Sequence, residues 1–274
     1  MPSQYCAWPM TLNLKSAHTK MRRGRELLDG LRTEIQSWSQ SVPYEITPQR
    51  NEEGTIFVAI LTFNAWPDLD RWAAIAGDII GNYRDALDHI IYALACEREG
   101  KDPPTYEQRL MFPICNDPKS FKSALKQNRL GTLADRQDFV DMIKGLQPYE
   151  GREPLLERLR ALHDAHKHRQ IRAVVLGVPH FDIRSEVEVG SSMAIWDGPL
   201  QRITPFVQLE YSTPRAGVVL NIQATVRIAF AEEPLKDKAG TDLPLLTVLA
   251  LLQETVRRVH ATLVYGGRVT PTQA

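Results

Sequence analysis

A long seam of apolar and small residues near the start of the chain constrains the fold most. Between residues 11 and 39 these residues recur at spacings of three and four: Leu14, Ala17, Met21, Gly24, Leu28, Leu31, Ile35 and Trp38. This is the heptad period of a helix that packs along another helix. The seam therefore predicts a long helix with a helical partner, either within a bundle or in a second subunit through self-association.

Three further segments have helical signals, and together with the first they predict a bundle. They cover about residues 69–98, 154–169 and 243–266. Pro154 suits the first turn of its helix, and Gly266 is a glycine of the kind that ends a helix. We expect the last helix to return and pack on the first two, so that the bundle forms the core.

Two regions have the pattern of strands instead. The extended runs 44–48 and 55–63 lie on either side of a polar turn at residues 51–54, which predicts a β-hairpin. Residues 171–231 are rich in β-branched residues and punctuated by Gly and Pro, which predicts an antiparallel sheet in a β-rich lobe. We therefore expect a single α+β domain over residues 1–274: a bundle of long helices with a β-hairpin and a C-terminal antiparallel sheet packed by a final helix.

Charge and cysteine content argue against several classes of protein. Lys plus Arg equal Asp plus Glu, 33 against 33, so no overall positive field draws the chain to nucleic acid, and such a contact would need a local patch. The three cysteines, Cys6, Cys96 and Cys115, form no CxxC pair, which argues against a disulfide framework and a thiolate zinc site. No signal-peptide pattern and no apolar run of about 18 residues is present. We expect a cytoplasmic protein with no membrane partner.

The second long helix concentrates ionisable side chains on one arc. On a helical wheel at about 100° per residue, the arc from Arg84 to His89 spans about 140°. The same arc contains Asp85, Asp88 and Tyr92. The opposite arc is apolar and should face the core, so the polar arc is either plain solvated surface or a functional site.

A second group of ionisable residues lies at the end of the 154–169 helix. On this helix Leu155, Leu159 and Leu162 form a stripe that continues in His166 and then Arg169, with Lys167 and His168 beside them. Ionisable residues that face inward are costly to bury unless they are paired. His166 and Arg169 are therefore expected to meet polar partners.

The polar arc of the second helix offers the most partners, which gives a geometric prediction. We expect residues 84–89 to pack against residues 162–169. The expected polar contacts join Arg84, Asp88 or His89 to His166 or Arg169.

Arg84 and His89 fit the pattern Arg-x4-His, with the acidic Asp85 directly after the arginine. The motif resembles that of the HEPN superfamily, helical-bundle proteins of which many cleave RNA without a metal ion. The resemblance implies Arg84 and His89 as catalytic residues, no cofactor, RNA as a partner and a motif that often pairs across a dimer. The remaining ionisable residues would support them: Asp85, Asp88, Tyr92, His166, Lys167, His168 and Arg169.

These residue types suit that chemistry. A histidine can take the proton of a ribose 2′-hydroxyl or return one to the leaving oxygen near neutral pH. An arginine can stabilise negative charge on the phosphate with its planar, always-charged group. In a bacterium, an activity of this kind would serve stress or defence.

A broader resemblance covers about residues 70–175. The segments 84–89, 112–114 and 167–169 resemble the RxxLDH, FPI and DKHR segments of uncharacterised bacterial proteins. His166 departs from that pattern, which has Asp at this position. This resemblance implies no activity; it implies only that the two helices belong to one unit.

Two other interpretations use the same residues. His163, His166 and His168, with Asp164, could form a metal site with a residue of the second helix, since His and carboxylate are suitable ligands. However, no HExxH is present, and His168 points about 160° away from His166 on a regular helix. Alternatively, the cluster is a structural salt-bridge network in a non-enzymatic interaction module.

Overall fold

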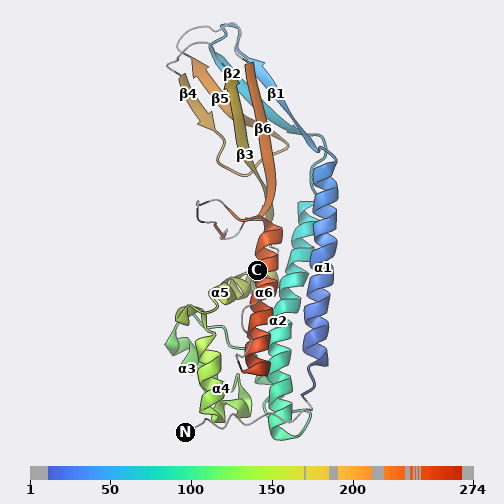
Figure 1. The fold of residues 1–274 in the computed structure, drawn as a ribbon, viewed down its shortest axis with the longest axis vertical. Coiled ribbons are helices and arrows are strands. Elements are labelled where there is room, and N and C mark those ends of the chain that lie inside the picture. Colours follow the sequence, from blue (N-terminus) through green and yellow to red (C-terminus); the bar gives the residue numbers. More distant parts are fainter. Residues whose placement is uncertain are drawn as a thin grey trace. The chain divides into compact units, whose positions relative to one another are not determined.

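The computed structural model describes residues 12–169, 171–184, 191–211, 219–231, 235–236, 238, 240 and 242–266. Its helices and strands follow one another as α1 (Lys15–Gln40), β1 (Tyr44–Arg50), β2 (Ile56–Phe63), α2 (Leu69–Glu99), α3 (Pro118–Lys126), α4 (Gln137–Gly145), α5 (Leu155–His168), β3 (Ala173–Arg184), β4 (Ser191–Ile195), β5 (Ile203–Tyr211), β6 (Val219–Phe230) and α6 (Leu245–Tyr265) (Figure 1). The predicted α+β class is confirmed. Residue 11 of the first predicted helix, Cys6, and the parts of the predicted β-rich lobe at 185–190 and 212–218 lie outside the described residues.

The chain divides into two compact units, and each is described by itself. The helical unit takes residues 12–29, 75–169 and 248–266 of the described chain, and the strand unit takes residues 30–74 and the described residues of 171–247. The helices α1, α2 and α6 contribute residues to both units. The expectation of one domain over residues 1–274 stays a prediction.

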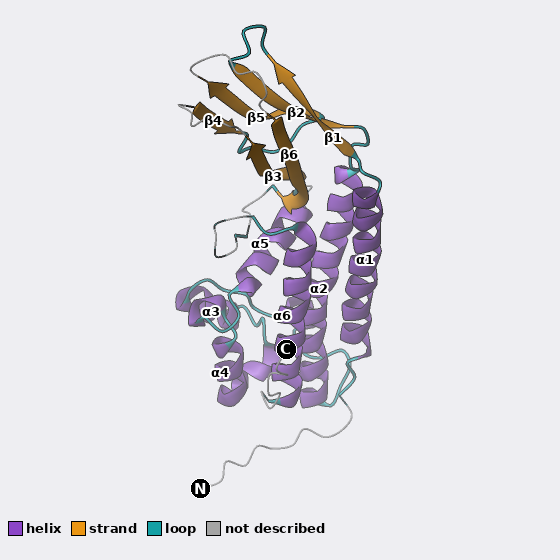
Figure 2. Ribbon diagram, turned by 45° about the horizontal axis from the view of Figure 1, so that its top comes forward, coloured by secondary structure: helices purple, strands orange, loops and turns teal. Residues whose placement is uncertain are grey.

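In the helical unit, α1, α2 and α6 lie side by side (Figure 2), and α1 also contacts α6 directly, where Nε2 of His18 lies 3.0 Å from Nε2 of His260. The apolar arc of α2 forms the core, with fully buried side chains at Ile79, Ile80, Leu87, Ile90, Ile91 and Leu94. Gly24 of the predicted seam lets α1 approach closely, because a Cβ at this position would lie 2.4 Å from Cε1 of Tyr83. The helix α2 ends at Glu99, and Gly100 follows in the left-handed conformation with φ +63°.

The strand unit contains an antiparallel sheet with strand order β1-β2-β5-β4 and a separate two-stranded sheet of β3 and β6. The predicted hairpin of β1 and β2 is confirmed. Its turn is held by Asn51, whose side-chain oxygen accepts the N–H groups of Thr55 and Ile56, both at 2.9 Å. The sequence does not show that β5 pairs with β2, so that the hairpin and two later strands share one sheet.

None of the described helices combines the length and the apolar composition that a membrane-spanning helix needs.

Candidate functional site

Arg84 binds α2 to the segment that contains Phe112. Its Nη2 donates to the main-chain oxygen of Phe112 at 2.7 Å and lies 2.9 Å from Oδ1 of Asp88. The same carboxylate oxygen of Asp88 accepts the main-chain N–H of Phe112 at 2.8 Å. Both main-chain polar groups of Phe112 are therefore satisfied by side chains of α2. We call these three residues the Phe112 clamp.

Burial is the largest influence on the pKa of Asp88 in the clamp. It raises the pKa of Asp88, while the charge of Arg84 and the N–H of Phe112 act in the opposite direction. Arg84 itself is only 7% exposed. Its second terminal nitrogen, Nη1, is buried and has no hydrogen-bond partner within the described part of the chain. A buried donor without an acceptor is unfavourable, and a bound ligand with a suitable oxygen would remove that cost.

Arg84 also lines a cavity of about 720 Å³, which we call the Arg84 cavity. Its walls come from α2, from residues 111–115, from Ala124 of α3, from Arg129 and from α5. The charged and imidazole side chains that line it are Arg84, Asp85, Asp88, Arg129, Arg160, His163, Asp164, His166, Lys167 and His168. Four Arg and Lys residues thus face three Asp residues, and Asp85 is also paired with Lys20 of α1 at 2.7 Å. The local balance favours an anionic ligand.

His163 is the residue of this cavity whose role the sequence does not reveal. Its pKa is lowered, mainly by burial and next by the charge of Arg84. The neutral imidazole is therefore favoured, and it can accept a proton at neutral pH. The sequence alone suggests His163 only as a metal ligand. The signal that was available is the phase of α5: Leu156 and Leu159 are buried, and His163 lies seven and four residues after them.

The predicted packing of residues 84–89 against residues 162–169 is found, since both segments line the Arg84 cavity. The imidazole of His166 also covers Gly77 of α2, where a Cβ would lie 2.1 Å from Nδ1 of His166.

The predicted polar contacts are not formed. Among the described residues, no hydrogen bond or ion pair joins Arg84, Asp88 or His89 to His166 or Arg169. The reason at Arg169 is that α5 ends at His168, and Arg169 continues in an extended conformation with φ −158° and ψ 158°. Arg169 therefore does not extend the leucine stripe, and it lines neither of the two cavities described in this section.

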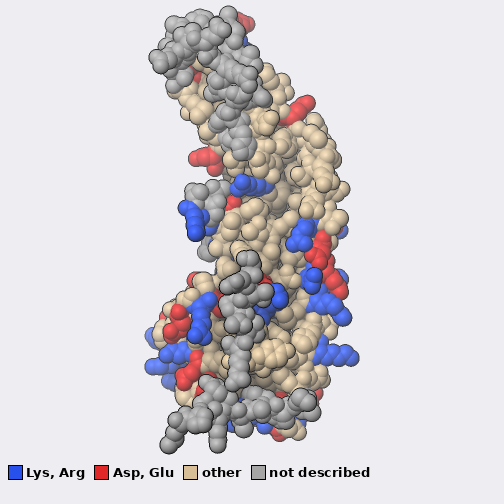
Figure 3. All heavy atoms as spheres, viewed as in Figure 1, with Lys and Arg blue, Asp and Glu red and all other residues tan. Residues whose placement is uncertain are grey.

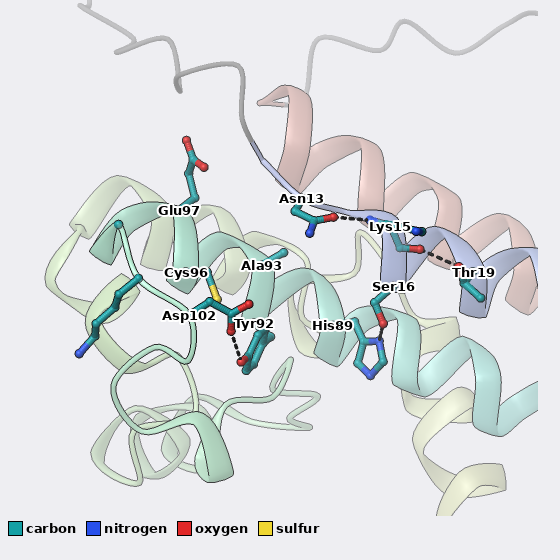
Figure 4. A pocket seen from close by; sticks show the side chains of 12 residues that line it. Asn13, Lys15, Ser16, Thr19, His89, Tyr92, Ala93, Cys96, Glu97 and Asp102 are labelled. Atoms are coloured by element: carbon teal, nitrogen blue, oxygen red, sulfur yellow. Dashed lines mark hydrogen bonds between the residues drawn. The ribbon is translucent and has the colours of Figure 1, made fainter.

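His89 lies on the other side of α2. Its Nδ1 is 2.7 Å from Oγ of Ser16 on α1. It lines a separate cavity of about 970 Å³, which we call the His89 cavity, together with Tyr92, whose hydroxyl donates to Oδ1 of Asp102 at 2.7 Å (Figure 4). Within this chain, the two residues of the Arg-x4-His motif thus line different cavities.

The remaining predicted residues divide between the two cavities. Asp85, Asp88, His166, Lys167 and His168 accompany Arg84, while Tyr92 accompanies His89. Although His163, His166 and His168 share one cavity, no group of three His, Cys, Asp or Glu side chains within the described chain is placed to hold a metal ion.

The molecular surface agrees with the even charge balance of the sequence. On the face in Figure 3, Lys and Arg side chains of the helical unit lie beside Asp and Glu side chains. The chain matches no family model, no curated protein and no solved structure. The assignment of a function therefore rests on the geometry of the cavities.

Proposed function

We propose that the Arg84 cavity binds the phosphate backbone of RNA and acts on it without a metal ion. The observation that carries the proposal is Nη1 of Arg84, which is buried without a partner in the described chain beside the imidazole of His163. A phosphate oxygen would supply the missing acceptor, and a guanidinium group is well suited to bind it. Lys167 lines the same cavity and would attract the neighbouring phosphates.

The chemistry would proceed by attack of the ribose itself. His163, neutral because of its lowered pKa, takes the proton of the 2′-hydroxyl. The 2′-oxygen then forms a bond to the adjacent phosphorus, and the bond from phosphorus to the 5′-oxygen breaks. Arg84 stabilises the negative charge on the phosphate. The proton that His163 took from the 2′-hydroxyl is then given to the leaving 5′-oxygen. The products are a 2′,3′-cyclic phosphate and a 5′-hydroxyl.

A second candidate function is a non-enzymatic interaction module, and the Phe112 clamp favours it. Arg84 and Asp88 have a structural task, because they satisfy both main-chain groups of Phe112. Replacing Arg84 would disturb the fold under either function. A decisive experiment must therefore change residues of the cavity that do not belong to the clamp.

The experiment uses labelled single-stranded RNA in the presence of EDTA. We expect His163→Asn to lower cleavage by about 10²–10⁴-fold, as is typical when a general acid or base is removed. His89→Asn is the matched control, because it removes an imidazole from the other cavity of the same helix. Circular dichroism checks that each variant is folded.

Binding is measured in parallel by fluorescence anisotropy. We expect Lys167→Gln to weaken RNA binding in the folded protein, because it removes a cation from the cavity. Folded protein that neither binds nor cleaves RNA would overturn the proposal and favour the interaction module. Loss of cleavage in His89→Asn but not in His163→Asn would move the activity to the other face of α2.

A further inference from the structure

The proposed function does not use the His89 cavity, which has the size and lining of a second ligand site. Its volume of about 970 Å³ lies within the range of about 300–1,000 Å³ that is usual for sites of small organic ligands. It is lined by Asn13, by Lys15, Ser16 and Thr19 of α1, by α2 from His89 to Glu97 and by residues 100–102 (Figure 4). The helical unit alone supplies this lining.

One end of the cavity has an acidic group without a basic partner. Asp102 accepts a hydrogen bond from the hydroxyl of Tyr92. The neighbouring Lys101 is directed elsewhere, since its Nζ donates to Oγ1 of Thr105 at 3.0 Å and lies 3.3 Å from Oε2 of Glu99. Within the described chain, no Lys, Arg or His nitrogen lies at ion-pair distance from the carboxylate of Asp102.

The surroundings of Asp102 favour a positive charge further. The helix α2 ends at Glu99, and the free carbonyl groups of a helix C-terminus provide a partial negative charge. The pKa of Tyr92 is raised, mainly by the hydrogen bond that its hydroxyl donates to Asp102, so the tyrosine stays an uncharged donor. Burial likewise raises the pKa of Cys96, and its thiol stays uncharged.

The same end of the cavity also has apolar surface. The ring of Tyr92 and the side chains of Ala93 and Cys96 lie in the lining beside Asp102 (Figure 4). A carboxylate beside an aromatic ring is a suitable combination for an organic cation, because the ring face also attracts positive charge. His89 also lines the cavity, with its Nδ1 2.7 Å from Oγ of Ser16.

From these contacts we propose that the His89 cavity binds a small organic cation. The ammonium group of this ligand pairs with Asp102, and its apolar part lies against Tyr92 and Ala93. The site is independent of RNA binding in the Arg84 cavity. It therefore stands even if the Arg84 cavity has another role.

Isothermal titration calorimetry with three ligands of one shape tests this site at neutral pH. The probes are hexylamine, which is cationic, hexan-1-ol, which is neutral, and hexanoate, which is anionic. We expect hexylamine to bind and the other two to bind at least about tenfold more weakly, because charge-assisted hydrogen bonds are the stronger ones. Equal binding of all three, or no binding of hexylamine, would overturn the proposal.

Variants of the chain locate the site. Asp102→Asn keeps an acceptor for the hydroxyl of Tyr92 and removes the charge, so we expect hexylamine to bind at least about tenfold more weakly. Asp141→Asn, at an exposed acid of α4, is the matched control and should leave binding unchanged. Binding that survives in Asp102→Asn would show that the cation is not held at this end of the cavity.

Discussion

The two faces of α2 hold the two residues of one sequence motif in very different surroundings. On one face, Arg84 is buried and bonded to both Asp88 and the main chain of Phe112. On the other face, the side chain of His89 has one hydrogen bond within the described part of the chain, to Ser16, and it lies beside a large cavity. Residues that are five positions apart on a helix point in directions about 140° apart. A motif spacing fixes these directions, and the neighbouring elements decide what each residue can do.

The largest expected difference between the two faces is in stability. We expect Arg84→Ala to lower the free energy of unfolding by about 3 kcal/mol, because Asp88 and the carbonyl of Phe112 lose their partner in a buried place. His89→Ala should lower it by less than about 1 kcal/mol, since its hydrogen bond is near solvent. Urea denaturation measures both values. Similar losses in the two variants would show that the faces do not differ in the way the contacts indicate.

Two glycines one turn apart on α2 test the packing at the Arg84 face without removing any charge. A Cβ at Gly77 would collide with the imidazole of His166, whereas a Cβ at Gly81 meets no atom within 4 Å. We expect Gly77→Ala to destabilise the protein by about 1–3 kcal/mol through overpacking. Gly81→Ala should stabilise it by up to about 1 kcal/mol, because alanine is the better helix former. Thermal unfolding would contradict this interpretation if the two shifts had the same sign.

His163 predicts a pH dependence that belongs to the Arg84 face. Its pKa in the folded protein is lowered from the ordinary value of 6.5, so the unfolded chain binds the proton more readily. The stability from the neutral imidazole is complete above about pH 6.5 and is lost as the pH falls through 6.5 towards the lower folded value. Urea denaturation between pH 7.5 and about pH 5 should therefore show a smaller loss in His163→Asn than in wild type. If the free energy of unfolding fell equally with pH in the two proteins, His163 would not be the cause of the pH dependence.

The smallest expected effect concerns the ion pair between Lys20 and Asp85. Both side chains are partly exposed, at 35% and 44%, so the pair should contribute less than about 1 kcal/mol. A double-mutant cycle with Lys20→Ala and Asp85→Ala measures this coupling. A larger coupling free energy would mean that the contact with α1 stabilises the Arg84 face as strongly as the Phe112 clamp does.

The sequence predicts the secondary structure well where the signal is local. The periodicities of α1, α2, α5 and α6 and the turn of the hairpin give the correct elements, because residues close in sequence determine them. The pairing of β2 with β5 and of β3 with β6 depends on segments far apart in the chain. No local pattern encodes which strand edge meets which.

The same division between local and long-range information applies to the prediction of the site. The sequence identifies both polar segments and their common location, but it does not show that Arg84 and Asp88 bind the main chain of Phe112. A main-chain partner leaves no trace in side-chain identity. The prediction for Arg169 is wrong because the leucine stripe assumes a helix that continues, whereas α5 ends at His168. The stripe includes Leu155, whereas the side chains that are buried on this helix are Leu156, Leu159 and Leu162.

The helical unit is assembled from three separate stretches of chain, and this has a consequence for protein synthesis. Its last stretch belongs to α6, whose residues Leu249, Leu252 and Val256 are buried. The ribosome therefore makes the whole strand region 171–247 before the core of the helical unit can close. Until then the apolar surface that α6 covers is open to water, which exposes the nascent chain to aggregation. The yield of folded protein would thus depend on how soon the completed chain is released from the ribosome, or on a chaperone that binds the chain before its release.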